Sequence, residues 1–205
     1  MNKNQLTNFI TKYTLGGEIK STKWTSNGDS LSTRFISGDK SVVGKVVLSK
    51  FSHLSPCELG VYNTGQLSSL LSVLGDDIDI NLSQSGDKFI SMEFEDTKRK
   101  TKSKYMLSDL SVIPTPPALK NLPDSFELGI KVDPYFINTF TSGKSALAEA
   151  ETFTILTENG ETKIVIGYAS IASNRVTIPV ETTKNAEIEP ISFNANMFAS
   201  ILNAN

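Results

Sequence analysis

Residues 58–75 read ELGVYNTGQLSSLLSVLG and contain the pattern that decides the fold. A short apolar run is followed by Asn63, a residue type that favours helix N-caps because its side-chain oxygen accepts a backbone N–H of the first turn. Leucines then recur three or four residues apart, which places them on one side of a helix. The stretch therefore predicts a short strand, a turn and an amphipathic helix.

The same pattern returns further along the chain. Residues 126–143 (FELGIKVDPYFINTFTSG) and 189–205 (EPISFNANMFASILNAN) each contain a short apolar run, then Asp133 or Asn194 at the N-cap position, then a helix with one apolar side. The N-terminal residues predict a further amphipathic helix. The chain thus repeats a β–α unit. The four predicted helices span residues 2–13, 64–74, 134–144 and 195–204.

Most of the remaining sequence consists of short alternating or β-branched runs separated by turns. The turns contain Asn-Gly, Gly-Asp or similar pairs, which tolerate positive φ and are typical of hairpins. These runs predict an α+β fold made mostly of antiparallel sheet. The predicted turns lie at residues 26–29, 37–40, 85–88 and 158–161, and the predicted strands at 41–49, 77–83, 88–95, 151–158 and 162–170.

Four of the eight prolines fall within residues 111–124, SVIPTPPALKNLPD. Proline lacks the N–H that a sheet ladder needs and restricts the residue before it, so this stretch predicts an extended connector. We expect an N-terminal domain over residues 1–110 and a C-terminal domain over residues 125–205.

The composition is that of an ordinary globular protein. The 205 residues are 39% hydrophobic and 20% charged, with a formal net charge of −2. A slightly negative net charge disfavours a protein that binds nucleic acid tightly over its whole surface. The single cysteine excludes an internal disulfide and fits a reducing compartment, and no stretch is typical of a signal peptide or membrane span. We expect a soluble, intracellular protein.

Residue patterns for catalysis or metal binding are sparse. The only histidine, His53, stands four residues from Cys57 in a Ser- and Pro-rich stretch, where an exposed loop histidine is the preferred interpretation over Cys/His catalysis. TSGKSA at 141–146 lacks the first glycine of a P-loop and ends a helix instead of following a strand. The aspartates within residues 76–79 are typical of a solvated turn. We expect no enzymatic activity, cofactor or metal.

The predicted helices contain neither Asp nor Glu, although the chain holds 22 acids. Solvent-facing helix surfaces usually carry carboxylates, so something excludes negative charge here. Neutral polar residues and a few lysines occupy the outer positions, as expected of a surface that lies beside a polyanion such as nucleic acid. The helix residues expected to face DNA are Lys3, Asn4, Asn8, Lys12, Ser69, Ser72, Asn138 and Lys144.

A dense run of positive charge lies within residues 98–104. One interpretation is an edge strand that lysines protect from pairing with other chains, and the run alone favours it. The other is a strip that faces phosphates. On the second interpretation Lys98, Arg99 and Lys100 join the residues expected to face DNA.

These features together resemble the DNA polymerase sliding clamps related to the proliferating-cell nuclear antigen, particularly the trimeric processivity factors of tailed bacteriophages. The closest stretch is VYNTGQLSSLLSVLGDDIDI at 61–80, followed by the hairpin LSQSGDKFISMEFED at 82–96. Residues 126–143 and ETKIVIGYAS at 161–170 are similar to second-domain parts of that family. The likeness covers most of the chain but includes no invariant signature.

The resemblance implies a DNA-clamp fold, in which two similar domains form a subunit and three subunits close into a ring. Short helices line the hole, and the sheets and most acids lie outside. A neutral inner wall would neither repel phosphates nor bind them strongly enough to stop sliding. The ring would encircle double-stranded DNA and tether the replicative DNA polymerase in the cytoplasm of a bacterial host, after loading by an ATP-driven clamp loader.

Two further sites are implied by the resemblance alone. A partner-peptide pocket near the connector would involve Val112, Ile113 and Pro114, with ordinary connector packing as the alternative. Subunits would join by pairing edge strands at residues 99–106 and 174–181. The interface residues in these strands would be Tyr105, Met106, Arg175 and Thr177.

The last predicted unit departs from the repeat because no strands follow its helix, which indicates a truncated or degenerate second domain. Two other functions stay open. One is a β-rich phage structural or assembly protein whose polar helix faces meet solvent or neighbouring subunits. The other is a single-stranded nucleic-acid binder, which is disfavoured because Trp24 is the only tryptophan and no aromatic residue interleaves with the basic run.

Overall fold

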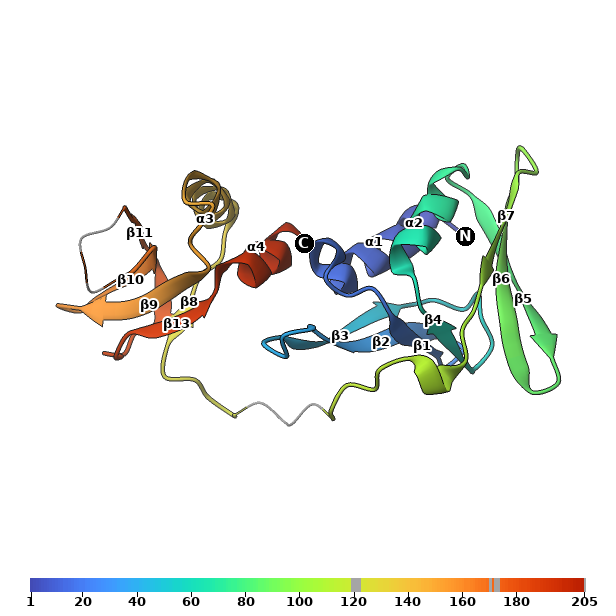
Figure 1. Cartoon of the computed structure of the whole chain (residues 1–205), viewed down its shortest axis with the longest axis horizontal. Coiled ribbons are helices and arrows are strands. Elements are labelled where there is room, and N and C mark those ends of the chain that lie inside the picture. The colour runs from blue at the N-terminus through green and yellow to red at the C-terminus, as the bar shows by residue number, and fades with distance from the viewer. Residues whose placement is uncertain (119–122, 170, 172–173, 205) are drawn as a thin grey trace. The chain divides into compact units, whose positions relative to one another are not determined.

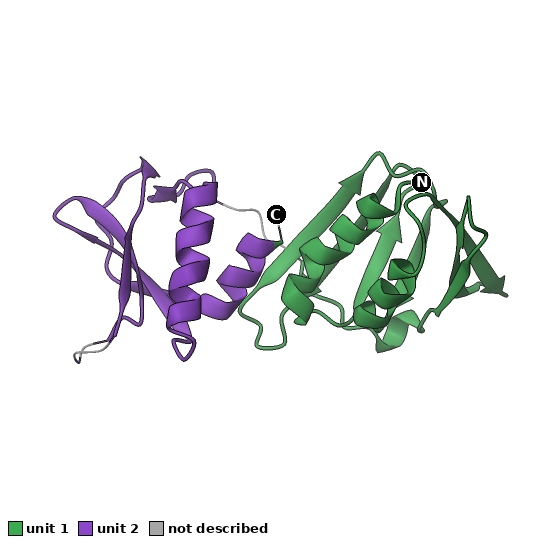
Figure 2. Ribbon diagram, turned by 90° about the horizontal axis from the view of Figure 1, so that it is seen from above, with its two compact units in different colours: residues 1–119, 204 green, residues 120–203, 205 purple. Residues whose placement is uncertain are grey.

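The computed structural model describes residues 1–118, 123–169, 171 and 174–204, and the chain divides into two compact units near residue 119 (Figures 1 and 2). Both units combine antiparallel sheets with short helices, so the α+β class is confirmed. Part of the predicted connector (119–122), the end of a predicted strand (Ser170) and Asn205 lie outside the described residues.

The first unit contains two antiparallel sheets, with strand orders β3-β2-β1-β4 and β5-β6-β7. Three of the predicted turns join β1 to β2, β2 to β3 and β5 to β6, and Gly28 and Gly86 there take the positive φ that such turns need. The strands are β1 (Thr22–Ser26), β2 (Ser30–Ile36), β3 (Val43–Ser49), β4 (Cys57–Val61), β5 (Ile78–Ser85), β6 (Lys88–Asp96) and β7 (Lys102–Met106).

Two helices, α1 (Lys3–Thr14) and α2 (Thr64–Ser72), lie side by side over one face of the four-stranded sheet (Figure 2). Buried Tyr13 joins these layers, because its hydroxyl accepts a hydrogen bond from Trp24 Nε1 at 3.2 Å and lies 3.3 Å from Thr64 Oγ1. Burial raises the pKa of the Tyr13 phenol far above its ordinary value. The short 3₁₀ helices η1 (Leu15–Gly17) and η2 (Leu110–Val112) complete the unit.

In the first unit, the segment that precedes each helix pairs with a strand of the other half. The segment before α1 pairs with the start of β5, with Lys3 N–H bonded to Asp76 O (2.7 Å) and Ile78 N–H bonded to Met1 O (2.9 Å). Conversely, β4, which precedes α2, pairs with β1 of the first half. Each half therefore has a leading segment, a helix and three strands; the leading segment is a full strand (β4) in the second half and a single bridge at Asn2 in the first.

The second unit contains the same motif. Its helix α3 (Pro134–Ala146) is followed by three strands, and the strand before α4 (Ala195–Asn203) pairs with the first of them, giving the order β11-β10-β9-β13. A separate two-stranded sheet pairs β12 with β8, so the predicted strand before α3 is shortened to two residues. The strands are β8 (Gly129–Ile130), β9 (Thr152–Glu158), β10 (Glu161–Ile166), β11 (Val176–Pro179), β12 (Thr182–Lys184) and β13 (Ile191–Asn194).

The predicted apolar sides of the helices form the cores. Leu6, Phe9, Ile10 and Tyr13 of α1 are all buried. In the second unit Phe140 makes edge contacts with Phe153 and Phe198, with ring centroids 5.1 and 5.0 Å apart. The predicted N-caps are also confirmed: Asn63 accepts Gln66 N–H (3.0 Å), Asp133 accepts Phe136 N–H (2.8 Å) and Asn194 accepts Met197 N–H (2.9 Å).

Candidate nucleic-acid interface

The first unit presents a neutral polar surface on the side of α1 and α2 away from the sheet. Asn4, Asn8 and Lys12 are exposed on α1, and Ser69 and Ser72 are exposed on α2. The two serine hydroxyls donate to helix carbonyls at 3.1 and 2.7 Å. Their hydrogen atoms are therefore already bonded within the helix, and the surface is only weakly polar. Neither helix contains a carboxylate. We call this surface the acid-free helix face.

The second unit has a face of the same kind. Its helices pack against each other, and neither contains an acid. Asn138 and Ser142 are exposed on α3, and Asn196 and Asn203 on α4. A single acid-free helix could arise by chance, but here both helices of each unit share the property.

Two lysines expected on these faces have structural roles instead. Lys144 is only 9% exposed, and its Nζ donates to Ala148 O at 2.8 Å, next to the C-terminal end of α3. Half-buried Lys3 donates from Nζ to Leu74 O, just past the end of α2. Both ammonium groups bind carbonyls at helix C-terminal ends, where positive charge is favourable. Burial of Lys144 is at odds with a DNA-facing role, the role of Lys3 toward DNA stays a prediction, and Lys12 is the fully exposed lysine of these helices.

The basic run is balanced by neighbouring acids. Its residues lie in β7 and the turn before it, and Glu93 and Glu95 of β6 stand directly opposite Lys104 and Lys102. The nearby ammonium groups hold the pKa values of both glutamates below their ordinary range. These exposed pairs favour the edge-strand interpretation, and the assignment of Lys98, Arg99 and Lys100 to a DNA-facing strip stays a prediction. The ion pairs are Lys98–Asp77 (3.1 Å), Lys100–Glu95 (3.6 Å), Lys102–Glu95 (3.0 Å) and Lys104–Glu93 (2.9 Å).

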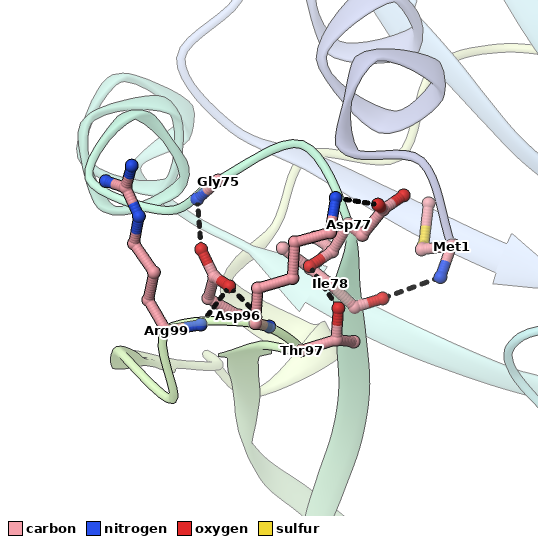
Figure 3. A network of polar contacts seen from close by, with 8 residues as sticks. Met1, Gly75, Asp77, Ile78, Asp96, Thr97 and Arg99 are labelled. Carbon is pink, nitrogen blue, oxygen red and sulfur yellow. Dashed lines mark hydrogen bonds and ion pairs between the residues drawn. The ribbon is translucent and has the colours of Figure 1, made fainter.

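Asp96, which the sequence analysis did not single out, organises the turn that carries this run (Figure 3). Its buried carboxylate accepts N–H bonds from Lys98 and Arg99 (both 2.8 Å) and from Gly75 (2.7 Å). These bonds hold its pKa below the ordinary value, the Arg99 N–H contributing most. The run is thereby attached to the segment after α2. In the described residues Arg99 is the member of the run without an ion pair.

The predicted partner-peptide residues differ in their surroundings. Ile113 is buried against the Gly60 backbone region, whereas Val112 is exposed. Pro114 lines a cavity of about 320 Å³ together with Arg34 and Pro116. A second cavity, of about 410 Å³, lies between β4 and residues 107–110. Connector packing therefore accounts for the burial of Ile113, and the partner-peptide pocket stays a prediction.

The predicted interface strands lie at sheet edges, since β7 ends one sheet and β11 ends another. Met106 is 60% exposed, and Arg175 and Thr177 are also exposed. Tyr105 is not: it is 3% exposed, and its hydroxyl accepts Asn63 N–H at 2.9 Å. Its assignment to an intersubunit contact is corrected to a core role.

The two residues considered for catalysis have different surroundings. His53 is exposed and stacks edge-on against Phe51 (5.3 Å), while half-buried Cys57 lies in β4, where burial raises its thiol pKa. Among the described residues no group of three or more His, Cys, Asp or Glu side chains could hold a metal ion. Over the same residues, no helix is long and apolar enough to cross a membrane.

No protein-family model matches this chain, and no curated protein shows significant similarity to it. Any functional conclusion therefore depends on the residues themselves.

Proposed function

We propose that the chain is a subunit of a sliding clamp, a ring that encircles duplex DNA and tethers a DNA polymerase during replication. The observation that carries the proposal is the acid-free helix face. Both helices of each unit expose neutral polar side chains, mainly Asn, Gln or Ser, and contain no carboxylate, although acids are plentiful elsewhere.

Lys3 and Lys144 bind backbone carbonyls, so they add little free positive charge to these faces. A face with so little charge suits sliding along DNA better than tight binding to it. Each phosphate contact by a lysine adds affinity by releasing counterions, and several such contacts would fix the protein on DNA. Neutral side chains can approach phosphates without repulsion and without a strong preferred position. In a closed ring, retention comes from encirclement, so the wall needs little affinity of its own.

Two architectural features support the same proposal. In both halves of the first unit a helix is followed by three strands, and the second unit begins with the same helix and three strands. The strands β7 and β11 stand at sheet edges, so their backbones are placed to pair with a neighbouring subunit. In the proposed trimer, β7 of one subunit would pair with β11 of the next.

The helix-face claim is tested by adding acids there. We expect Asn8→Glu with Ser69→Glu to lower retention on nicked circular plasmid about tenfold, because carboxylates would face phosphates. Gln84→Glu with Ser85→Glu, on exposed positions of β5, gives the matched control. Equal retention of both folded double variants would contradict the proposal and favour a phage structural or assembly protein.

A further inference from the structure

The outer face of the four-stranded sheet carries a row of cations that crosses three strands. Lys23 of β1 stands directly opposite Arg34 of β2, and Arg34 stands directly opposite Lys45 of β3. Their neighbours Trp24, Thr33 and the other core residues point toward the helices, so strand alternation puts this row on the opposite face. We call these three residues the basic row.

The basic row is not neutralised within the described part of the chain. None of its members forms an ion pair there, whereas four of the five cations in residues 98–104 do. Arg34 and Lys45 are exposed, and Lys23 makes only a neutral hydrogen bond, to Thr115 Oγ1 at 2.9 Å. Like charges directly opposite each other destabilise a sheet. Like charges that stand opposite each other without ion-pair partners are expected where those charges bind another molecule.

Apolar side chains flank the row on the same face. On one side lie Val43 and Ile36, which are registered partners, and on the other lies exposed Val47. The connector residues Pro114 and Pro116 line the cavity of about 320 Å³ together with Arg34, and Glu18 and Lys20 also line it, one acid and one further cation. The surface therefore offers positive charge bordered by apolar contacts.

We propose that this outer sheet face binds an acidic segment of a partner protein in which apolar residues alternate with carboxylates. The carboxylates would bind the basic row, and the apolar side chains would contact the flanking valines, Ile36 and the connector prolines. Nucleic acid fits less well, because the described residues offer no exposed aromatic ring on this face for stacking, and the apolar borders would have no partner in a phosphate backbone. The inference does not depend on the proposed clamp function.

The test uses the full chain and a labelled peptide in which aspartate and leucine alternate, followed by fluorescence anisotropy at low and moderate salt. We expect binding that weakens with salt, and no binding of the same peptide with serine in place of aspartate. Arg34→Glu with Lys45→Glu should lower the affinity about tenfold, whereas the matched double reversal Arg99→Glu with Lys100→Glu, at exposed positions of the turn before β7, should leave it unchanged.

Circular dichroism establishes that each variant is folded, and Arg34→Gln with Lys45→Gln gives a milder second test with an intermediate affinity. The proposal is overturned if the acidic peptide does not bind at low salt or if the double reversal binds it as tightly as the parent chain. Tighter binding of a single-stranded oligothymidylate than of the peptide would also overturn it, in favour of a nucleic-acid site.

Discussion

Asp96 satisfies three backbone N–H groups at once, those of Gly75, Lys98 and Arg99. Asn in its place would keep one acceptor oxygen and turn an amide NH₂ toward an N–H donor. We expect Asp96→Asn to lower the denaturant midpoint, because a buried donor would lose its partner.

The same residue makes a pH-dependent contribution to stability. Its pKa is lower in the folded chain than the value of about 4 expected when unfolded, so the carboxylate stabilises the fold above that pH. The contribution is lost as the pH falls through the folded-state pKa. The difference in midpoint between the wild type and Asp96→Asn should therefore be largest at neutral pH and shrink below about pH 4; a pH-independent difference would contradict this account.

Phe140 tests the core of the second unit. It is fully buried and contacts the rings of Phe153 and Phe198, so Phe140→Ala should lower the free energy of unfolding by about 3–5 kcal/mol. Phe126 is 55% exposed, and Phe126→Ala should change it by less than about 0.5 kcal/mol. Urea denaturation of both variants measures the contrast, and equal losses would show that the packing is misassigned.

Among the secondary-structure elements, α3 depends on its N-cap. Asp133 accepts the Phe136 N–H at 2.8 Å, so Asp133→Ala should cost about 1 kcal/mol of stability. Asp133→Ser, which keeps an acceptor oxygen, should cost much less. Thermal denaturation followed by circular dichroism distinguishes the two, and equal destabilisation would mean that the cap contributes little.

A substitution in strand β2 is expected to stabilise the chain, unlike the substitutions above. Arg34→Thr removes the middle charge of the basic row and introduces a residue with high β propensity. We expect it to raise the free energy of unfolding by about 0.2–1 kcal/mol, because two unfavourable cross-strand pairs disappear. A loss of stability would show that Arg34 has a structural role.

Helices and hairpins were predictable because their signals are local. The leucine spacing of α2, the caps Asn63 and Asp133 and the turn at Gly28 each act over a few residues. The partner of Lys3 was not predicted, because Leu74 is 71 residues away and its position depends on tertiary structure. The Lys144 contact is local, since Ala148 is four residues away, and could have been considered as a lysine capping the end of α3.

The charge arrangement was partly predictable. Glu93 and Glu95 alternate in β6, and Lys102 and Lys104 alternate after a short turn, which is the pattern of cross-strand pairs in a hairpin. That signal could have shown that the run is balanced. The basic row required the register of three strands, and its members are 11 residues apart in sequence, so no local pattern reveals it.

At the scale of the whole molecule, each unit combines an acid-free helix face with antiparallel sheets. In the first unit, the charged residues that stand opposite one another lie on the sheets. In the first unit one sheet balances its cations with glutamates, and the other leaves the basic row uncompensated. The expectation of an acidic outer surface therefore does not hold for the sheet β3-β2-β1-β4. The proposed clamp would use the helix faces for DNA and this sheet face for partner proteins.

The central claim is that retention on DNA comes from encirclement by a closed ring. Assembly can be driven without a loader by diluting the chain until subunits separate and then concentrating it with nicked circular plasmid, followed by gel filtration at high salt. We predict that the protein elutes with the circular DNA, has the mass of a trimer when free, and is released when a single restriction cut makes the plasmid linear. A monomer at all concentrations, or retention that is the same before and after the cut, would contradict the account.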